Sequence, residues 1–187
     1  MGDLPAPSAQ TLASRGARLA ETLARRRVQL GFAAAAVILV FAQPTWATWR
    51  AGLVIAFAGE SLRLWATGHL EKGREVTRSG PYRFLRHPLY AGSIVIAIGV
   101  AVASRSVAVT AVVALYMGLT IPAAIRFEEA QLRQAFGATY DDYLASRAAP
   151  MARRFSVARA VRNREYRALG GLMLGFALLA LKMLATL

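Results

Sequence analysis

Hydrophobic residues along this chain are gathered into long runs, and the polar residues lie in the segments between them. Such runs predict membrane-spanning helices, because about 20 predominantly apolar residues in a helix cross the hydrocarbon core of a bilayer. The runs fall at residues 28–42, 49–66, 88–103, 107–125 and 168–187. No segment alternates between apolar and polar residues as a half-buried strand does. We therefore predict an all-α fold, a polytopic membrane bundle of about five transmembrane helices.

The connections between the runs predict how the helices are arranged. Only residues 104–106 separate the third run from the fourth, so these two helices are expected to form a tight antiparallel hairpin. The last run contains GGLMLG at 170–175, whose small residues permit close contact with another helix. No separate soluble domain is visible, so we expect a polar N-terminal segment at 1–27 and a single membrane domain at 28–187.

The first run has two interpretations. A basic start followed by a short apolar stretch, here 28–42, is also typical of a secretory signal. A retained first span is favoured, because the distribution of charge is most regular when this span is counted.

Charge adds the orientation of the helices. The chain has 187 residues, 56% of them hydrophobic, and a formal net charge of +13, which in a soluble protein would suggest nucleic-acid binding. Segments 15–27, 72–86 and 126–167 hold five, five and nine of the 23 basic residues. Basic flanks resist translocation, so these three segments are expected on the cytoplasmic side. We predict a protein of the bacterial cytoplasmic (inner) membrane with a cytoplasmic N-terminus, a C-terminus on the opposite side, and membrane lipids rather than nucleic acid as partners.

The residue types that bind metals are scarce in this sequence. Cysteine is absent, so disulfides, thiolate catalysis and thiolate metal sites are excluded. Two histidines, His69 and His87, are too few for a histidine cluster, and no metal is expected.

Three short motifs follow one another along the chain. The first, Gly80 to Tyr90, reads GPYRFLRHPLY, the second is the adjacent pair Glu128 and Glu129, and the third is FGATYDDY at 136–143. Their order and spacing resemble the isoprenylcysteine carboxyl methyltransferases and their bacterial relatives over roughly residues 60–150. The resemblance implies that this part is catalytic, that the span at 168–187 is additional, and that the methyl donor is S-adenosyl-L-methionine.

The first motif contains the start of a helix. Pro88 suits a first helical turn, and the free backbone N–H groups there can receive an anion such as the carboxylate of the methyl donor. His87 would then lie at the cap of this helix. The alternative is an interfacial histidine that caps the helix and has no catalytic role.

The two glutamates cannot act alike. Successive helical residues lie about 100° apart, so only one of Glu128 and Glu129 can face a small ligand well. A carboxylate in such a place can accept hydrogen bonds from an ammonium group or from ribose hydroxyls, and it favours a sulfonium cation nearby. The alternative is a solvated acidic turn that pairs with Arg126, Arg133 or lipid headgroups.

The resemblance also implies a set of site residues. The cofactor site it implies consists of Arg74, Glu75, Val76, Thr77, Tyr82, His87, Pro88, Leu89, Tyr90 and Glu128. The candidate catalytic residues are His87, Glu128, Glu129 and Arg126. The rings of Tyr82 and Tyr90 can stack on adenine or contact the sulfonium, although tyrosines are also common at membrane interfaces.

One position departs from the family pattern. Prenylcysteine carboxyl methyltransferases have an arginine four residues before the matching glutamate, which orients the substrate carboxylate, and this chain has Ala124 there. Arg126 lies about 200° away around a helix and is no automatic replacement. Glu60 and Arg63 share one face of the second span, as an ion pair or facing the substrate. The candidate substrate residues are Glu60, Arg63 and Arg126.

We therefore expect an integral membrane methyltransferase with a cofactor pocket on the cytoplasmic face and a lipophilic or amphipathic acceptor. Carboxyl methylation like that of the resembled family, N-methylation of a phospholipid, and methylation of a small thiol all remain open. An amine acceptor would need a base, for which Glu129 or His87 can serve. A non-catalytic transporter or scaffold is the alternative of another class.

Overall fold

The computed structural model describes Thr22, Arg26 and residues 29–185. The described residues contain helices and no strand, which confirms the all-α prediction for this part of the chain. The elements are a helix at Gln29–Phe41, α2 (Trp46–Thr67), the 3₁₀ helix η1 (Gly80–Arg83), α3 (Pro88–Ser104), α4 (Val107–Phe136), α5 (Ala138–Leu144), α6 (Val157–Arg162) and α7 (Glu165–Ala185). The predicted polar segment 1–27 lies almost entirely outside the described residues.

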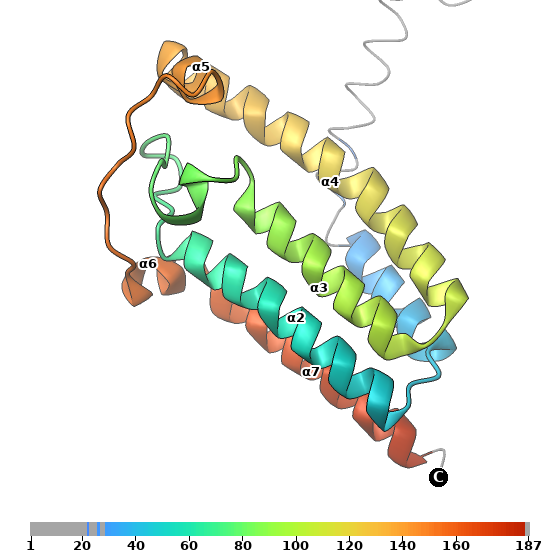
Figure 1. Ribbon diagram of the computed structural model, residues 1–187. Coiled ribbons are helices and arrows are strands. Elements are labelled where there is room, and N and C mark those ends of the chain that lie inside the picture. The colour runs from blue at the N-terminus through green and yellow to red at the C-terminus, as the bar shows by residue number, and fades with distance from the viewer. Residues whose placement is uncertain (1–21, 23–25, 27–28, 186–187) are drawn as a thin grey trace, which may run out of the picture.

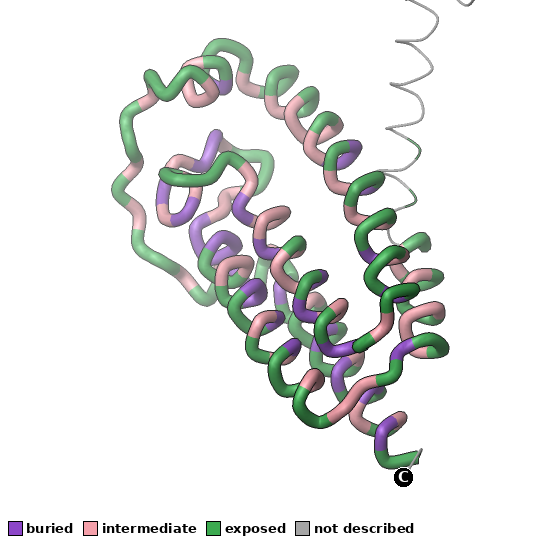
Figure 2. Tube along the Cα trace, turned by 45° about the vertical axis from the view of Figure 1, so that its right-hand side comes forward, coloured by how far each residue is buried: buried purple, intermediate pink, exposed green. Residues whose placement is uncertain are grey.

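The long helices form an elongated bundle that is open at one end. Helix α2 packs against α3 and against α7, while α3 adjoins α4 through the short link at Arg105 and Ser106 (Figure 1). From this link, α4 leans away from α3 toward α5. Figure 2 shows buried residues along the whole bundle. One cluster of buried apolar residues packs α2, α3, α4 and α7 together toward the end that contains the link. They are Ala42, Ala56, Ala97, Ala103, Val109, Val113, Leu172, Phe176 and Leu179.

Local sequence explains where the helices begin. Thr45 and Thr48 form a capping box at the start of α2, and the Ser106 side chain accepts a hydrogen bond from the Val109 backbone at the start of α4. Pro88 occupies the first turn of α3, where its missing N–H has no partner to lose. Arg105 adopts a left-handed conformation with φ of 48°, which ends α3 and reverses the chain within two residues.

The closest helix contact is between α2 and α3, along a row of glycines. A Cβ atom at Gly59 would lie 2.6 Å from the carbonyl oxygen of Gly92, and one at Gly99 would lie 2.6 Å from that of Gly52. The two glycines of each helix are seven residues apart and therefore share one face. We call these four residues the glycine seam. Small residues at such a contact let two backbones touch.

The small residues of GGLMLG at 170–175 do not form, with any described residue, the close helix contact that they would permit; that kind of contact occurs at the glycine seam instead. A Cβ atom added at Gly170, Gly171 or Gly175 would meet nothing within 4 Å among the described residues, so these glycines make no close helix contact there. Helix α7 is joined to the bundle by Leu172, Phe176 and Leu179, which belong to the buried apolar cluster, and by polar contacts. The indole nitrogen of Trp49 donates to the Phe176 carbonyl at 2.9 Å. Lys182 Nζ donates to the carbonyls of Leu39 and Val40, both at 2.7 Å, at the end of the first helix.

Within the described residues, α4 and α7 are long and apolar enough to cross a membrane. Helix α3 is comparably apolar but has only 17 residues, and α2 carries Arg50, Glu60 and Arg63. Many large apolar side chains on these helices point outward, including Val54 on α2, Ile98 on α3 and Leu115 on α4. Such exposed apolar surface suits contact with lipid rather than water.

Candidate active site

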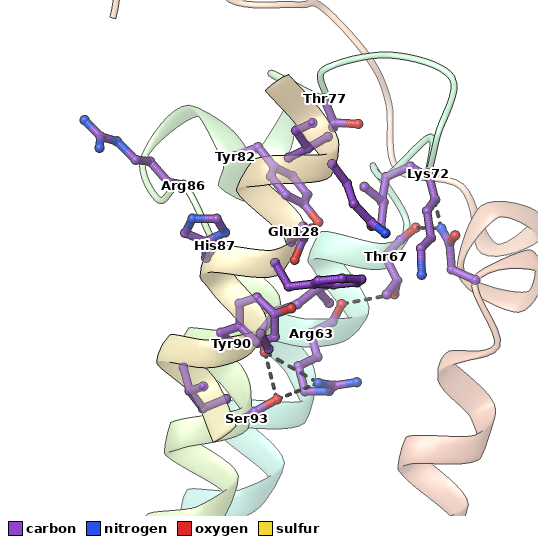
Figure 3. Close-up of a pocket in the computed structure, with 18 of the residues that line it drawn as sticks. Arg63, Thr67, Lys72, Thr77, Tyr82, Arg86, His87, Tyr90, Ser93 and Glu128 are labelled. Carbon is purple, nitrogen blue, oxygen red and sulfur yellow. Dashed lines mark hydrogen bonds between the residues drawn. The ribbon is translucent and has the colours of Figure 1, made fainter. Parts of the chain in front are cut away.

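A cavity of about 660 Å³ occupies the open end of the bundle. Its walls come from the end of α2, the loop that leads to η1, Tyr82 of η1, the start of α3, α4 from Tyr116 onward, α5, Asn163 after α6, and Glu165 at the start of α7. Figure 3 shows the walls formed by α2, the loop, α3 and α4. At the opposite end of the bundle the helices are packed together by the apolar core. The cavity lies where α4 diverges from α3, away from that core (Figure 1).

The cavity gathers most of the residues expected to hold the cofactor. Those that line it are Glu75, Val76, Thr77, Tyr82, His87, Leu89, Tyr90 and Glu128. Arg74 and Pro88 do not line it: the Arg74 side chain is exposed, and Pro88 is buried in the first turn of α3. Residues separated by more than fifty positions in sequence, such as Glu75 and Glu128, thus line the same cavity.

Tyr82 is held in place by its backbone. The chain turns at Gly80, where φ is +56° and a Cβ atom would lie 2.5 Å from the His69 ring, so this position requires glycine. The Tyr82 carbonyl then accepts a hydrogen bond of 2.9 Å from the Tyr143 hydroxyl. Burial, aided by the negative charge of Glu128, raises the pKa of Tyr82. The Tyr82 hydroxyl therefore keeps its proton and can donate a hydrogen bond at physiological pH.

His87 and Glu129 form a pair at the side of the cavity. His87 is the N-cap residue of α3, yet its side chain makes no capping hydrogen bond. Its Nε2 instead lies 3.0 Å from Oε1 of Glu129, and its ring lies against that of Tyr90 with centroids 5.9 Å apart. The pair gives the histidine ring a defined orientation and a carboxylate partner, a feature that can assist a general base.

The adjacent carboxylates of α4 point to different partners. Glu128 lines the cavity, while Glu129 binds His87 and does not line it. Two positions earlier, Arg126 is exposed and also lies outside the cavity lining. Ala124 lines the cavity and is 3% exposed. At the position where the resembled prenylcysteine carboxyl methyltransferases have an arginine, this chain therefore places only a methyl group on the cavity wall.

Arg63 combines both expected possibilities, an ion pair and a cavity-facing position. Its Nε lies 2.8 Å from Oε1 of Glu165 and 3.6 Å from Oε2 of Glu60. Its Nη1 donates to the Ser93 hydroxyl at 2.6 Å, and it lies 3.5 Å from the Leu89 carbonyl. Arg63 and Glu165 line the cavity, whereas Glu60 is buried behind them.

Sequence reasoning missed the residues that the C-terminal part brings to the site. Asn163 lines the cavity and donates to the carbonyls of Thr67 and Leu70, both at 2.9 Å, which fastens it to the end of α2. Glu165 begins α7 and is 5% exposed. An acidic residue at a helix start is a common feature, so nothing in the sequence singled it out. Tyr140 and Tyr143 of the third motif also line the cavity.

A set of arginines ties the segment before α7 to the loop after α2. Arg153 lies 2.6 Å from a carboxylate oxygen of Glu75, and Arg162 lies 2.9 Å from one of Glu71. Arg159 Nε donates to the Gly68 carbonyl at 2.8 Å. The loop that forms the wall at Glu75 to Thr77 is therefore braced from outside, and the Glu75 carboxylate is already paired.

No group of three or more His, Cys, Asp and Glu side chains that could hold a metal ion occurs in the part of the chain that the structure describes. The polar lining includes five tyrosines, three glutamates, three threonines and two arginines. Such a lining can bind an organic ligand with hydroxyl, carboxylate and cationic groups.

Comparisons with known proteins identify relatives of this chain. The model of the phospholipid methyltransferase family matches residues 28–139. The cobalt-zinc-cadmium resistance protein CzcN of Cupriavidus metallidurans is 37% identical over 107 residues, 52% of this chain and 50% of the relative. The nickel-cobalt-cadmium resistance protein NccN of Alcaligenes xylosoxydans is 35% identical over 94 residues, 49% of this chain and 42% of the relative.

A third relative comes from rice. A probable protein-S-isoprenylcysteine O-methyltransferase of Oryza sativa is 32% identical over 91 residues, 49% of this chain and 48% of the relative. The chain spans about half the length of these curated relatives. No solved structure matches the chain significantly.

Proposed function

The chain belongs to the phospholipid methyltransferase family, and we propose that it is an integral membrane enzyme that methylates a lipophilic or amphipathic acceptor with S-adenosyl-L-methionine as the donor. The relative named as a probable isoprenylcysteine O-methyltransferase supports the same class of enzyme. The observation that carries the proposal is the convergence of the three motifs on one cavity, which is lined by Tyr82 to Tyr90 from the first, Glu128 from the second, and Tyr140 and Tyr143 from the third.

The cavity suits the proposed donor in size and in chemistry. Its volume of about 660 Å³ lies in the range of small-molecule sites. Glu128 would accept hydrogen bonds from ribose hydroxyls or from an ammonium group, and the start of α3 would offer backbone donors to a carboxylate. The rings of Tyr82 and Tyr90 would contact the adenine or the sulfonium. The donor supplies a methyl group on a positively charged sulfur, which is reactive without a metal.

The protein's own contribution is alignment and exclusion of water. Holding two reactants in line can supply roughly 7–11 kcal/mol of the barrier at best. A carboxylate acceptor needs no base near pH 7, whereas an amine must lose a proton, for which the His87 and Glu129 pair can serve. Tyr116, Met117 and Ile121 of α4 line the cavity with largely apolar surface, which suits the tail of an amphipathic acceptor.

We further propose that the described helix Gln29–Phe41 and α2, α3, α4 and α7 all cross the bacterial cytoplasmic membrane, with α3 and α4 as a hairpin. The cavity then opens to the cytoplasm, where the donor is made. Two of the three basic segments support this orientation, because 72–86 and 126–167 both lie at the cavity end of the bundle. Residues 28–187 form one membrane domain in this proposal.

Purified full-length protein in detergent tests the function in two steps. Isothermal titration calorimetry should detect binding of S-adenosylmethionine and of its demethylated product, S-adenosylhomocysteine, and either should raise the melting temperature. Incubation with methyl-labelled donor and extracted bacterial lipids should then transfer the label to one lipid fraction. If neither ligand produces heat or thermal stabilisation at millimolar concentration, the protein is not this kind of enzyme.

A further inference from the structure

We propose that α6 and the residues beside it rest on the membrane and bind anionic phospholipid head groups there. We call residues 154–167 the α6 surface. They lie beyond the 28–139 region that matches the family, and outside the cavity described above except at Asn163 and Glu165. The proposal rests on the proposed crossing of the membrane by α7 and is independent of the methyl-transfer reaction.

One face of α6 is attached to the protein. Ala160 is buried, and Arg159 Nε donates to the Gly68 carbonyl at 2.8 Å. Asn163, directly after the helix, donates to two backbone carbonyls near the end of α2. Figure 1 shows α6 beside the end of α2 and the start of α7, on the outside of the bundle. These contacts fix which face of the short helix points outward.

The outward face of α6 is apolar. Val157 and Val161 are four residues apart and share one side of the helix, and they are 67% and 55% exposed. Phe155 before the helix and Tyr166 after it are also exposed. Several large apolar side chains that are exposed within so short a segment suit contact with lipid rather than water.

The cations around this face exceed the carboxylates. The α6 surface contains five arginines and one acidic residue. Two of these arginines pair with Glu71, and the acidic residue is buried and pairs with Arg63. The remaining three are exposed and form no ion pair with any described residue: Arg154, Arg164 and Arg167. Exposed guanidinium groups beside an apolar face are complementary to a membrane surface with anionic head groups.

The start of α7 places this surface at the depth of the head groups. Helix α7 is long and apolar enough to cross a membrane, and it begins at Glu165, three positions after the end of α6. Its first turn carries Tyr166 and Arg167, and the guanidinium carbon of Arg167 lies 6.0 Å from the centre of the Tyr166 ring. Tyrosine and arginine are typical of the ends of membrane-spanning helices. An amphipathic helix at this depth lies in the plane of the interface, with its apolar face toward the acyl chains.

A fluorophore on the α6 surface can report both the contact and its charge preference. The chain has no cysteine, so Val157→Cys can carry a single nitrobenzoxadiazole label. The labelled full-length protein is placed in phosphatidylcholine vesicles with an equal small fraction of either brominated phosphatidylcholine or brominated phosphatidylglycerol. Bromine atoms quench the label on contact. Both leaflets have the same composition, so the direction of insertion does not affect the result.

Brominated phosphatidylglycerol should quench the label about twofold more than brominated phosphatidylcholine, because the arginines enrich anionic lipid around α6. Arg164→Gln combined with Arg167→Gln should bring the two values close together. The matched control is Arg133→Gln combined with Arg147→Gln, which removes the same charge from arginines that pair with carboxylates of α5. This control should keep the preference for the anionic lipid.

Equal quenching by the two brominated lipids before any arginine is changed would show an apolar contact alone and would overturn the binding of anionic head groups. Absence of quenching by either lipid would place α6 in water and refute the membrane contact itself. A preference that survives the loss of Arg164 and Arg167 would assign it to other cations. If that double variant does not fold, the comparison of the two lipids with the Val157→Cys protein still decides. Failure of the methyltransferase proposal is seen separately, as absence of S-adenosylhomocysteine binding.

Discussion

Glu128 and Glu129 are neighbours in sequence but have different surroundings. The 100° step between helical residues turns Glu128 into the cavity and Glu129 toward His87. The same rotation leaves Arg126 exposed on the outside of α4. One turn of helix therefore separates a ligand-facing carboxylate, a carboxylate that orients a histidine, and a surface cation.

Substitutions on this turn should separate donor binding from surface charge. Glu128→Gln keeps the shape of the side chain but removes its charge, so S-adenosylhomocysteine binding should weaken by about 1.5–3 kcal/mol, the value of a hydrogen bond to a charged group. That loss corresponds to roughly 10–150-fold in the dissociation constant, which calorimetry measures directly. Arg126→Ala should leave the affinity nearly unchanged. If Arg126→Ala abolishes binding while Glu128→Gln has no effect, the donor does not lie against Glu128.

At the scale of elements, the pairing of α2 with α3 depends on the glycine seam. Backbone atoms meet where other residues would place side chains, and Arg63 and Ser93 extend across the same interface into the cavity. The seam thus sets the distance between two walls of the site.

Gly59→Ala should therefore destabilise the protein, although alanine is the better helix former. Its Cβ would lie 2.6 Å from the Gly92 carbonyl oxygen and 2.7 Å from the Ile96 nitrogen, so the helices must separate. We expect a loss of about 1–3 kcal/mol, seen as a lower melting temperature in detergent. Gly118→Ala on α4 is the control, because a Cβ atom there meets nothing within 4 Å among the described residues. Equal melting temperatures for the two variants would mean that α2 and α3 do not touch at Gly59.

The described part of the molecule has a packed end and a hollow end, and the basic segments 72–86 and 126–167 lie at the hollow one. Basic loops stay on the cytoplasmic side of a membrane. The hollow end should therefore face the cytoplasm, and the links at 42–45 and 105–106 should face the opposite side.

Single cysteines can test this orientation, because the chain has no cysteine of its own. Gln43 and Arg74 are exposed, and they lie in the segments that precede and follow α2, at opposite ends of that helix. In intact bacterial cells made permeable only at the outer membrane, an impermeant maleimide should label Gln43→Cys and leave Arg74→Cys unlabelled. Both should react once the cytoplasmic membrane is opened. Labelling of Arg74→Cys alone in intact cells would reverse the proposed topology.

The sequence by itself determined the elements and the chemistry of the main wall. Apolar runs marked the helices, and charge marked the expected cytoplasmic side. The helical step of 100° was enough to predict that the Glu128 and Glu129 side chains point in different directions. The motif at Gly80 to Tyr90 pointed to the loop and helix start that line the cavity. These features depend on residues close together in the chain, where local geometry is nearly fixed.

Only the tertiary structure decided which helix faces touch. Lipid and a protein interior are similarly apolar, so a hydrophobic run does not reveal which side meets a partner helix. The glycines of GGLMLG were therefore indistinguishable in sequence from those of the seam. The contact of Glu165 with Arg63, 102 positions away, likewise depends on how α7 packs against α2. No local rule predicts that packing, because it is set by the fit of whole helices.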